Sequence, residues 1–174
     1  MVSTTFLNLE ATKQARITDA LLQEFSTHPL ATAQVARIVQ QAQIARGAFY
    51  KYFTDLPDAY RYLYQQAMQE IHSTIPRAAF TTFTPTIYLQ EVREFVEQAG
   101  SSRYYALIKY HLTQNQALLT PVAASAPANV PSNVWAAGIL SHETIKQILL
   151  YPDTQAAALK RLASALQAMV GEDD

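Results

Sequence analysis

The 174-residue chain has no cysteine, only four glycines and no long uninterrupted hydrophobic run. Without cysteine it can form neither a disulfide nor a thiolate, which is compatible with a reducing cytoplasm. No stretch approaches the roughly 18 apolar residues that a membrane-spanning helix needs. The opening residues, MVSTTFLNLEA, lack a basic start and an apolar core, so we expect no signal peptide. These absences predict a cytoplasmic protein without a membrane partner.

The patterns that mark common catalytic and metal sites are also missing. None of the four histidines stands three or four residues from another histidine, and His142-Glu143 is not followed by the spaced histidine of a zinc protease. There is no phosphate-binding glycine loop and no Gly-x-Ser-x-Gly nucleophile motif. The sequence therefore predicts no enzyme, no metal site and no cofactor.

The composition predicts an all-α protein. At 49% hydrophobic residues the chain can bury a sizeable core and form one or two domains. Glycine is scarce and strand-like alternation is absent. Outside the region 32–53, helical patterns cover about Thr12–Ser26, a stretch that starts after Asp55 and stops before Pro76, Pro85–Ala99, Ser101–Leu118, Ser132–Leu150 and Asp153–Val170.

The segment from Thr32 to Phe53 predicts two short helices joined by a tight turn. Val35, Ile38 and Val39 form an apolar stripe at helical spacing, with Thr32 as the expected N-cap. A second helix that begins near Ala45 turns one face inward and the opposite face, made of Arg46, Gly47, Tyr50 and Lys51, outward. Such a pair is typical of a helix-turn-helix, whose second helix enters the major groove of DNA.

The local charge favours the same interpretation. No acidic residue stands between Glu24 and Asp55, whereas Arg37, Arg46 and Lys51 are positive. Because the whole chain carries a net charge of −1, we expect one local phosphate-binding patch. Gly47 would let the helix backbone approach DNA closely, Arg46 suits guanine or phosphate, and Tyr50 and Lys51 suit phosphate oxygens. The alternative is an ordinary packed helix pair with a solvated polar face.

Residues 13 to 64 resemble the N-terminal domain of the tetracycline-repressor (TetR) family of bacterial regulators. The segments KQARITDALLQEF, VARIVQQAQIARGAFYKYF and TDLPDAYRYLY carry the similarity. The family signature Gly-x-(Leu/Phe)-Tyr-x-(Tyr/His)-Phe is matched by Gly47, Phe49, Tyr50, Tyr52 and Phe53. The resemblance implies a helix-turn-helix DNA-binding domain over residues 10–55 and a helical C-terminal regulatory and dimerisation domain over residues 56–174.

We expect nine residues to form or border the DNA-facing surface. Ala48 and Tyr52 are included because the resemblance places them there, although the helical wheel turns both toward the core. The nine are Gln34, Gln43, Ala45, Arg46, Gly47, Ala48, Tyr50, Lys51 and Tyr52. Behind this surface, the apolar residues expected to hold the three helices together are Phe25, Val35, Ile38, Ile44, Phe49 and Phe53.

The chain departs from the family pattern at several positions. Gln43 replaces the usual turn glycine, and a left-handed glutamine costs roughly 1 kcal/mol. Ala45 replaces the usual Ser or Thr cap, Leu56 stands where a phosphate-binding Lys is frequent, and Pro29 replaces a Gly. These departures motivate an alternative function, a helical protein-interaction module that keeps the fold and has lost DNA binding.

The C-terminal region contains two further candidate sites. The segment SSRYYALIKYHL is rich in aromatics that could line an effector pocket or, alternatively, belong to an ordinary core. The candidate pocket residues are Tyr88, Tyr104, Tyr105, Tyr110, His111 and Trp135. An enzyme or ligand carrier that uses these aromatics is a rival function.

The last two helices could pack within the chain or against a second copy as a four-helix bundle. The resemblance implies the second arrangement, with interface candidates Ile145, Leu149, Leu159, Leu162, Leu166 and Met169. The resulting hypothesis is a homodimeric, ligand-responsive repressor that binds a double-stranded DNA operator. A small-molecule effector would weaken DNA binding by preferring another separation of the two recognition helices.

Overall fold

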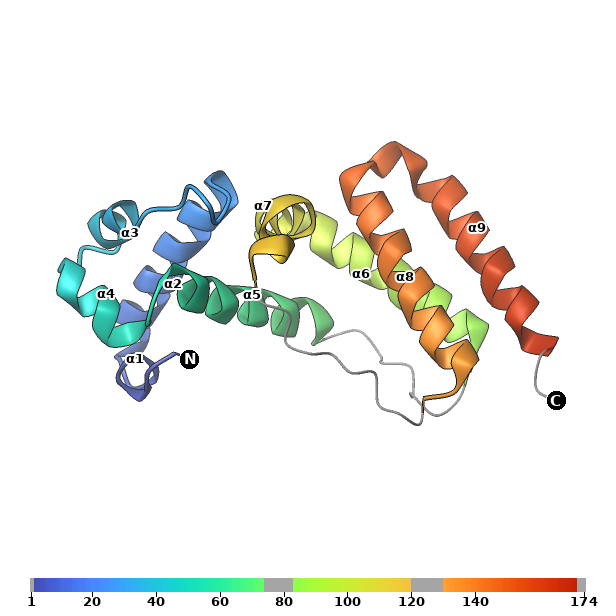
Figure 1. Cartoon of the computed structure of the whole chain (residues 1–174), viewed down its shortest axis with the longest axis horizontal. Coiled ribbons are helices and arrows are strands. Elements are labelled where there is room, and N and C mark those ends of the chain that lie inside the picture. The colour runs from blue at the N-terminus through green and yellow to red at the C-terminus, as the bar shows by residue number, and fades with distance from the viewer. Residues whose placement is uncertain (1, 74–82, 120–129, 172–174) are drawn as a thin grey trace. The chain divides into compact units, whose positions relative to one another are not determined.

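The computed structural model describes residues 2–73, 83–119 and 130–171 (Figure 1). Every regular element among them is helical, with no strand in these three ranges. No helix in the described part of the chain combines the length and hydropathy needed to cross a bilayer. The chain divides into two compact units, Met1–Glu70 with Arg103–Thr120, and Ile71–Ser102 with Pro121–Asp174.

The first unit contains the three helices predicted around the helix-turn-helix. The predicted helix over residues 12–26 is present as α2, in which Ile17, Leu21 and Phe25 lie on one face and are fully buried. The ring of Phe25 meets Tyr60 edge-on at a centroid distance of 5.2 Å. The elements are α1 (Thr4–Leu7), α2 (Ala11–Thr27), α3 (Val35–Gln41), α4 (Arg46–Tyr52), most of α5 (Leu56–His72), α7 (Tyr105–Tyr110), the π-helical η1 (His111–Asn115) and the 3-10 turn η2 (Gln116–Leu118).

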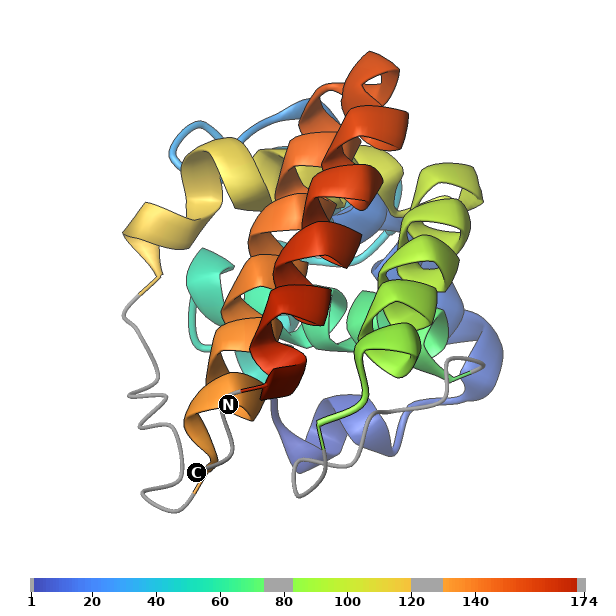
Figure 2. The ribbon, with the colours of Figure 1, turned by 90° about the vertical axis from the view of Figure 1, so that its right-hand side faces the viewer.

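The second unit is built around α6 (Pro85–Ser101), α8 (Ser132–Leu150) and α9 (Gln155–Ala168). The helices α8 and α9 run side by side, joined through the 3-10 turn Pro152–Thr154, and α6 packs against both (Figure 2). The core they enclose consists of Tyr88, Val92, Val96, Ala137, Ile148, Ala158, Leu159, Leu162 and Leu166. Partly buried Ile145 and Met169 pack against it.

This core shows which of the predicted interface residues pack within the chain. Leu159, Leu162 and Leu166 are at most 6% exposed, and Leu149 is 2% exposed, within a single chain. The stripe predicted to face a second copy is therefore occupied by contacts inside the chain. Of the six predicted interface residues, Ile145 and Met169 stay partly exposed, and the dimer interface stays a prediction.

Two elements differ from the sequence expectation. The short helix α1 was not predicted, because four residues are too few to show helical periodicity. The predicted helix over residues 101–118 begins only at Tyr105 and changes to a π-helix at His111.

The packing units also do not coincide with the predicted functional division at residues 55 and 56, since most of α5 and all of α7 pack in the first unit. That functional division stays a prediction.

Candidate nucleic-acid interface

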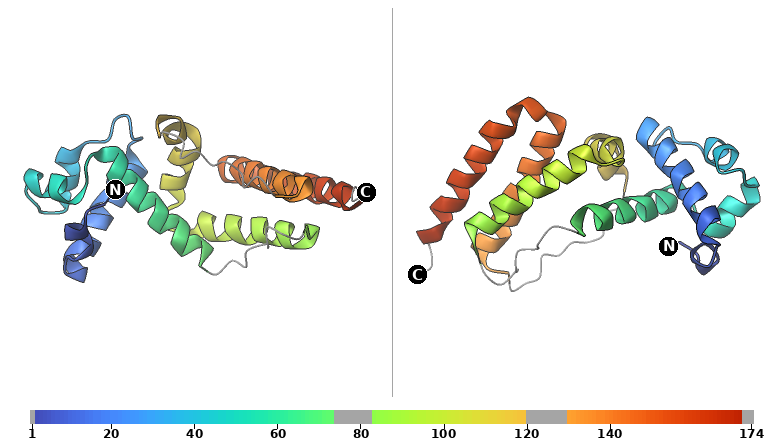
Figure 3. Two further views of the ribbon diagram at one scale, coloured as in Figure 1. Left: turned by 60° about the horizontal axis from the view of Figure 1, so that its bottom comes forward. Right: turned by 180° about the vertical axis from the view of Figure 1, so that it is seen from behind.

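The turn between α3 and α4 adopts the strained conformation that the sequence comparison anticipated. Gln43 has a φ of 52°, and it is the one non-glycine residue with positive φ in the described ranges. The Gln43 N–H donates to the Gln40 carbonyl at 3.3 Å, and the Ile44 N–H donates to the Val39 carbonyl at 3.0 Å. Arg16 of α2 donates through Nε to the carbonyl of Ala42 at 2.9 Å. The turn is thus tied to α2 despite its unfavourable residue. Figure 3 draws the backbone of the chain from two further sides.

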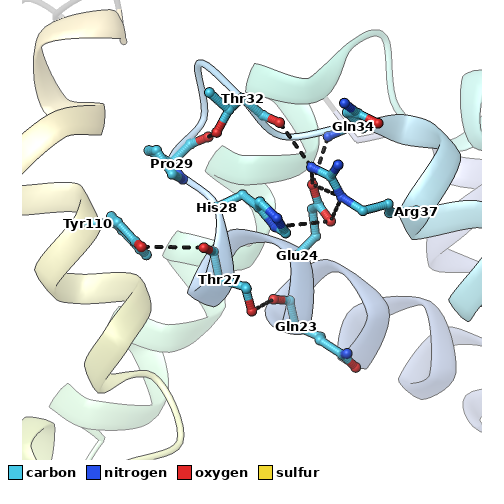
Figure 4. Close-up of polar contacts among 9 residues, drawn as sticks. All are labelled: Gln23, Glu24, Thr27, His28, Pro29, Thr32, Gln34, Arg37 and Tyr110. Carbon is cyan, nitrogen blue, oxygen red and sulfur yellow. Dashed lines mark hydrogen bonds and ion pairs between the residues drawn. The ribbon is translucent and has the colours of Figure 1, made fainter.

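A buried carboxylate holds the start of α3. Gln34 occupies the N-cap but makes no side-chain capping bond. Instead Oε1 of Glu24, on α2, accepts the Gln34 N–H at 2.8 Å (Figure 4). The helix start is satisfied from a neighbouring helix, so the prediction of Thr32 as the cap was wrong.

Arg37 binds the same carboxylate through two nitrogens. Its Nε lies 2.8 Å from Oε2 of Glu24 and its Nη2 lies 2.6 Å from Oε1, and Nη2 also donates to the Thr32 carbonyl at 2.9 Å. Figure 4 shows these bonds converging on Glu24, whose side chain is 4% exposed. Arg37 therefore neutralises an internal charge, which removes it from the basic patch that the sequence suggested.

The pKa of Glu24 reflects the balance in this cluster. Burial by itself raises the pKa of the carboxyl, but the hydrogen bonds from Arg37 and the Gln34 N–H, together with the charge of Arg37, hold the pKa below its usual value. Glu24 is consequently ionised near neutral pH, and it pairs with Arg37 in a site largely shielded from solvent.

The outward face of α4 brings together the central predicted residues. Arg46, Gly47, Tyr50 and Lys51 are all exposed, with Tyr50 at 50%. An Arg46 Nη2 atom lies 3.4 Å from the Tyr50 hydroxyl, so the two side chains run alongside each other. At the border of this surface, Gln34, Gln43 and Ala45 are exposed and Ala48 is half-buried.

The inward face of α4 anchors it. Phe49 is fully buried and Phe53, which follows the helix, is 1% exposed, with ring centroids 5.4 Å apart. Val35, Ile38 and Phe25 are buried as predicted, whereas Ile44 is only half-buried. The helix is therefore held outward by the hydrophobic cluster behind it.

Tyr52 does not belong to the exposed face. It is 5% exposed, and its ring lies 5.7 Å from that of Phe6 in α1. The helical wheel had turned Tyr52 inward, and the family pattern had placed it at DNA. The structure agrees with the inward position that the helical wheel predicted for Tyr52, because the unpredicted helix α1 covers this side chain.

Gly47 has no structural need to be glycine inside the chain. A Cβ atom built on it would meet nothing within 4 Å, and its φ is not in the left-handed region. Glycine within a helix is less stable than alanine by roughly 0.5–1 kcal/mol. The packing of the chain itself therefore gives no reason for a glycine at this position.

The predicted pocket residues do not share one unit. Tyr88 is 6% exposed in the core of the second unit, and Trp135 of the same unit is 54% exposed. Tyr104, Tyr105, Tyr110 and His111 belong to the first unit. A surface hollow there is lined by Leu112, Thr113, Gln114, Gln116 and Ala117, none of which was predicted.

Tyr104, Tyr110 and His111 make contacts within the first unit. The Tyr104 hydroxyl donates to Glu70 at 2.9 Å, and the Tyr110 hydroxyl donates to the Thr27 carbonyl at 3.3 Å. His111 stacks on Tyr64 at 3.8 Å between ring centroids, and burial lowers the pKa of its imidazole. Within the described ranges, no three metal-ligating side chains gather.

Comparison with known proteins identifies the helix-turn-helix. Residues 17–55 match the family model of bacterial regulatory proteins of the tetR family, from the middle of α2 to the residue before α5. Residues 17–55 are therefore similar to the helix-turn-helix domain of the TetR family. The prediction of that family from the motif around Gly47 and Tyr50 is confirmed. The turn, helix α4 and its exposed basic face all lie inside the matched range.

Solved structures extend the likeness in fold beyond the TetR domain. A TetR family transcriptional regulator from Chloroflexus aurantiacus is 19% identical, with a TM-score of 0.54 over 97% of this chain and 96% of that one. A proposed transcriptional regulator from Streptomyces coelicolor is 18% identical, with a TM-score of 0.55 over 90% of this chain and 97% of that one. No protein of curated function matches the sequence. The predicted all-α fold, an N-terminal TetR domain followed by a helical region, is confirmed.

Proposed function

We propose that the chain is a homodimeric, ligand-responsive TetR-type repressor that binds a double-stranded DNA operator through α4. The observation that carries this proposal is the exposed face of α4, where Arg46, Gly47, Tyr50 and Lys51 point outward from a buried Phe49 anchor. The N-terminal part of such a helix contacts base edges, and arginine suits guanine while tyrosine and lysine suit phosphates.

The experiment that tests DNA binding is selection of genomic fragments with the purified protein, followed by titration of a selected duplex at several salt concentrations. Phosphate contacts make the logarithm of affinity fall linearly with the logarithm of salt concentration. Failure to retain any duplex at low salt would refute the proposal.

A Gly47→Ala substitution separates the DNA surface from the fold. Because an added Cβ meets nothing inside the chain, we expect the free energy of unfolding to stay the same or rise by up to about 1 kcal/mol. Operator affinity should fall about tenfold or more, as expected for one disturbed interface contact. Fluorescence anisotropy and chemical denaturation measure the two effects.

The matched control is Gly100→Ala, since Gly100 of α6 also has nothing within 4 Å of an added Cβ. It should leave operator affinity unchanged. Equal DNA affinity for Gly47→Ala and wild type would remove the close helix approach from the proposal.

For the homodimer, we propose an interface on an exposed face of α8 in place of the stripe predicted from the sequence. Trp135 and Ile139, one helical turn apart, are 54% and 52% exposed. Gly138 lies beside them with open space around its missing Cβ. Exposed apolar side chains of this size, grouped on one helix, are typical of a protein interface, and operator half-sites are commonly bound by a two-fold dimer.

We expect a Trp135→Glu, Ile139→Glu variant to be monomeric under conditions in which the wild type is a dimer. Two charges in an apolar interface should raise the dimer dissociation constant about 100-fold or more, since anchor residues commonly contribute 2 kcal/mol or more each. Sedimentation equilibrium gives the constant. The control is Leu118→Glu with Tyr151→Glu, two apolar side chains exposed elsewhere. A double mutant that remains dimeric would exclude this face.

Specific features also favour the second candidate, a helical interaction module without DNA binding. The N-cap residue Ala45 makes no side-chain bond to α4, and Gln43 strains the turn before it. Such a module would still form the dimer and would show no salt-dependent binding of any duplex.

If the protein binds an operator, a reporter gene placed behind that operator would distinguish repression from activation.

A further inference from the structure

The N-terminal helix α1 is folded back onto the end of α4. The Ser3 N–H donates to the Tyr52 carbonyl at 3.0 Å, and the Ser3 hydroxyl donates to the Lys51 carbonyl at 2.8 Å. The last carbonyl groups of an α-helix accept no N–H bond within the helix and need hydrogen-bond donors from outside it. In α4, the carbonyls of Lys51 and Tyr52 both accept hydrogen bonds from Ser3, which lies 48 positions before Lys51.

The same serine also starts α1. Its Oγ accepts the Phe6 N–H at 3.2 Å, as an N-cap does. One hydroxyl therefore joins two helices, because it accepts a bond from the first turn of α1 and donates a bond to the last turn of α4. A side chain without a hydroxyl at position 3 would break both links.

The ring of Phe6 adds apolar contacts between α1 and the end of α4. It is fully buried, and its ring centroid lies 5.7 Å from Tyr52, 4.9 Å from Phe53 and 5.0 Å from Tyr62. Tyr52 and Phe53 lie at the end of α4, while Tyr62 belongs to α5. Phe6 thus packs between the last turn of α4 and the helix α5.

The N-terminal end of α4 lacks a side-chain cap in the described part of the chain. Its N-cap Ala45 offers no side-chain acceptor, and the helix has only seven residues. Helices this short are not stable by themselves and depend on tertiary contacts. The contacts from Ser3 and Phe6 therefore act at the C-terminal end of α4, directly beside Tyr50 and Lys51.

We propose that Ser3 and Phe6 are positioning residues for DNA recognition, which hold the last turn of α4 so that Tyr50 and Lys51 face the phosphate backbone. The proposal rests on the proposed function, because it assigns a role in DNA contact to a segment outside the helix-turn-helix. Both residues act through the orientation and rigidity of α4.

The test compares Ser3→Ala with Thr5→Ala, which removes an exposed hydroxyl from the same short helix. In the free protein, amide hydrogen exchange over residues 50–53 should become about fivefold to tenfold faster in Ser3→Ala alone, the range expected for loss of one capping hydroxyl. Operator affinity should fall by a similar factor of about five to ten, with an unchanged salt slope because the phosphate contacts remain the same in number.

Ser3→Thr, which keeps the hydroxyl, should restore both readouts. Phe6→Leu provides a second, milder disturbance, since Phe6→Ala would leave a large cavity. Unchanged exchange in α4 for Ser3→Ala, or equal effects of Ser3→Ala and Thr5→Ala, would overturn the proposal. The exchange measurement needs no DNA, so absence of duplex binding by the wild type would refute the proposed function without deciding whether Ser3 holds α4.

Discussion

An Arg46→Ala, Lys51→Ala variant is expected to bind its operator about 100-fold or more weakly than the wild type, because base and phosphate contacts are commonly worth about 1–3 kcal/mol each. Both side chains are exposed, and the one side-chain bond described for Arg46 is its long contact with Tyr50. Their removal should therefore leave folding and assembly intact. The slope of affinity against salt should fall by up to about two, one for each lost phosphate contact.

The control must remove the same charge elsewhere. Arg93→Ala with Lys160→Ala does so, because both side chains are exposed and belong to the second unit. Anisotropy titrations over a salt series would measure both variants against the same duplex. If the two double mutants lose affinity equally, the effect comes from net charge, and α4 is not the recognition surface.

Arg37→Ala is expected to lower the free energy of unfolding clearly more than a neutral surface substitution does, because it leaves the buried carboxylate of Glu24 without its charged partner. The loss should be smaller than for a fully buried pair, because the Arg37 side chain is 37% exposed. The loss should also weaken DNA binding indirectly, since the same carboxylate holds the Gln34 N–H at the start of α3. Denaturant unfolding at pH 7 measures the effect.

The pH dependence gives a second signature of this pair. In the wild type, the folded state holds the pKa of Glu24 below its ordinary value of 4.5, so protons bind the unfolded chain first as the pH falls. The stability from this group is present above pH 4.5 and is lost as the pH falls through the folded pKa. Without Arg37, burial dominates and raises the pKa of Glu24, so the variant should lose stability at a higher pH than the wild type.

A double-mutant cycle supplies the control for this prediction. Glu24→Ala with Arg37→Ala removes both charges and should be less destabilised than the sum of the two single variants. Arg37→Lys should show an intermediate loss, since lysine keeps the charge without the two parallel bonds. A change below about 0.5 kcal/mol for Arg37→Ala, the usual range of neutral surface substitutions, would contradict the role given to the pair.

Much of the recognition helix could be predicted from local pattern. The spacing of Phe49 and Phe53 indicated an inward side, and Arg46, Gly47, Tyr50 and Lys51 fell on the other side of the same wheel. The structure has the same separation of faces. The left-handed turn residue could also be located, because the family pattern places glycine at the position that Gln43 occupies.

Contacts distant in sequence could not be predicted in this way. Nothing local distinguishes Glu24, buried on α2, from a solvated acid, and nothing local shows that Arg37 binds it. The four residues of α1 contain too little pattern to predict either the burial of Phe6 or the covering of Tyr52. The stripe on α9 predicted an amphipathic helix without indicating whether its partner was α8 or a second copy.

The sequence by itself determined the helical class, the positions of the main helices and the outward face of α4, because helical periodicity and turn chemistry depend on neighbours within a few residues. Only the tertiary structure decided which charges are available and which apolar residues face solvent. Arg37 is paired while Arg46 is exposed, and Leu162 is buried while Trp135 is not. Each of these outcomes depends on a partner from another helix, and the pattern along one helix does not specify that partner.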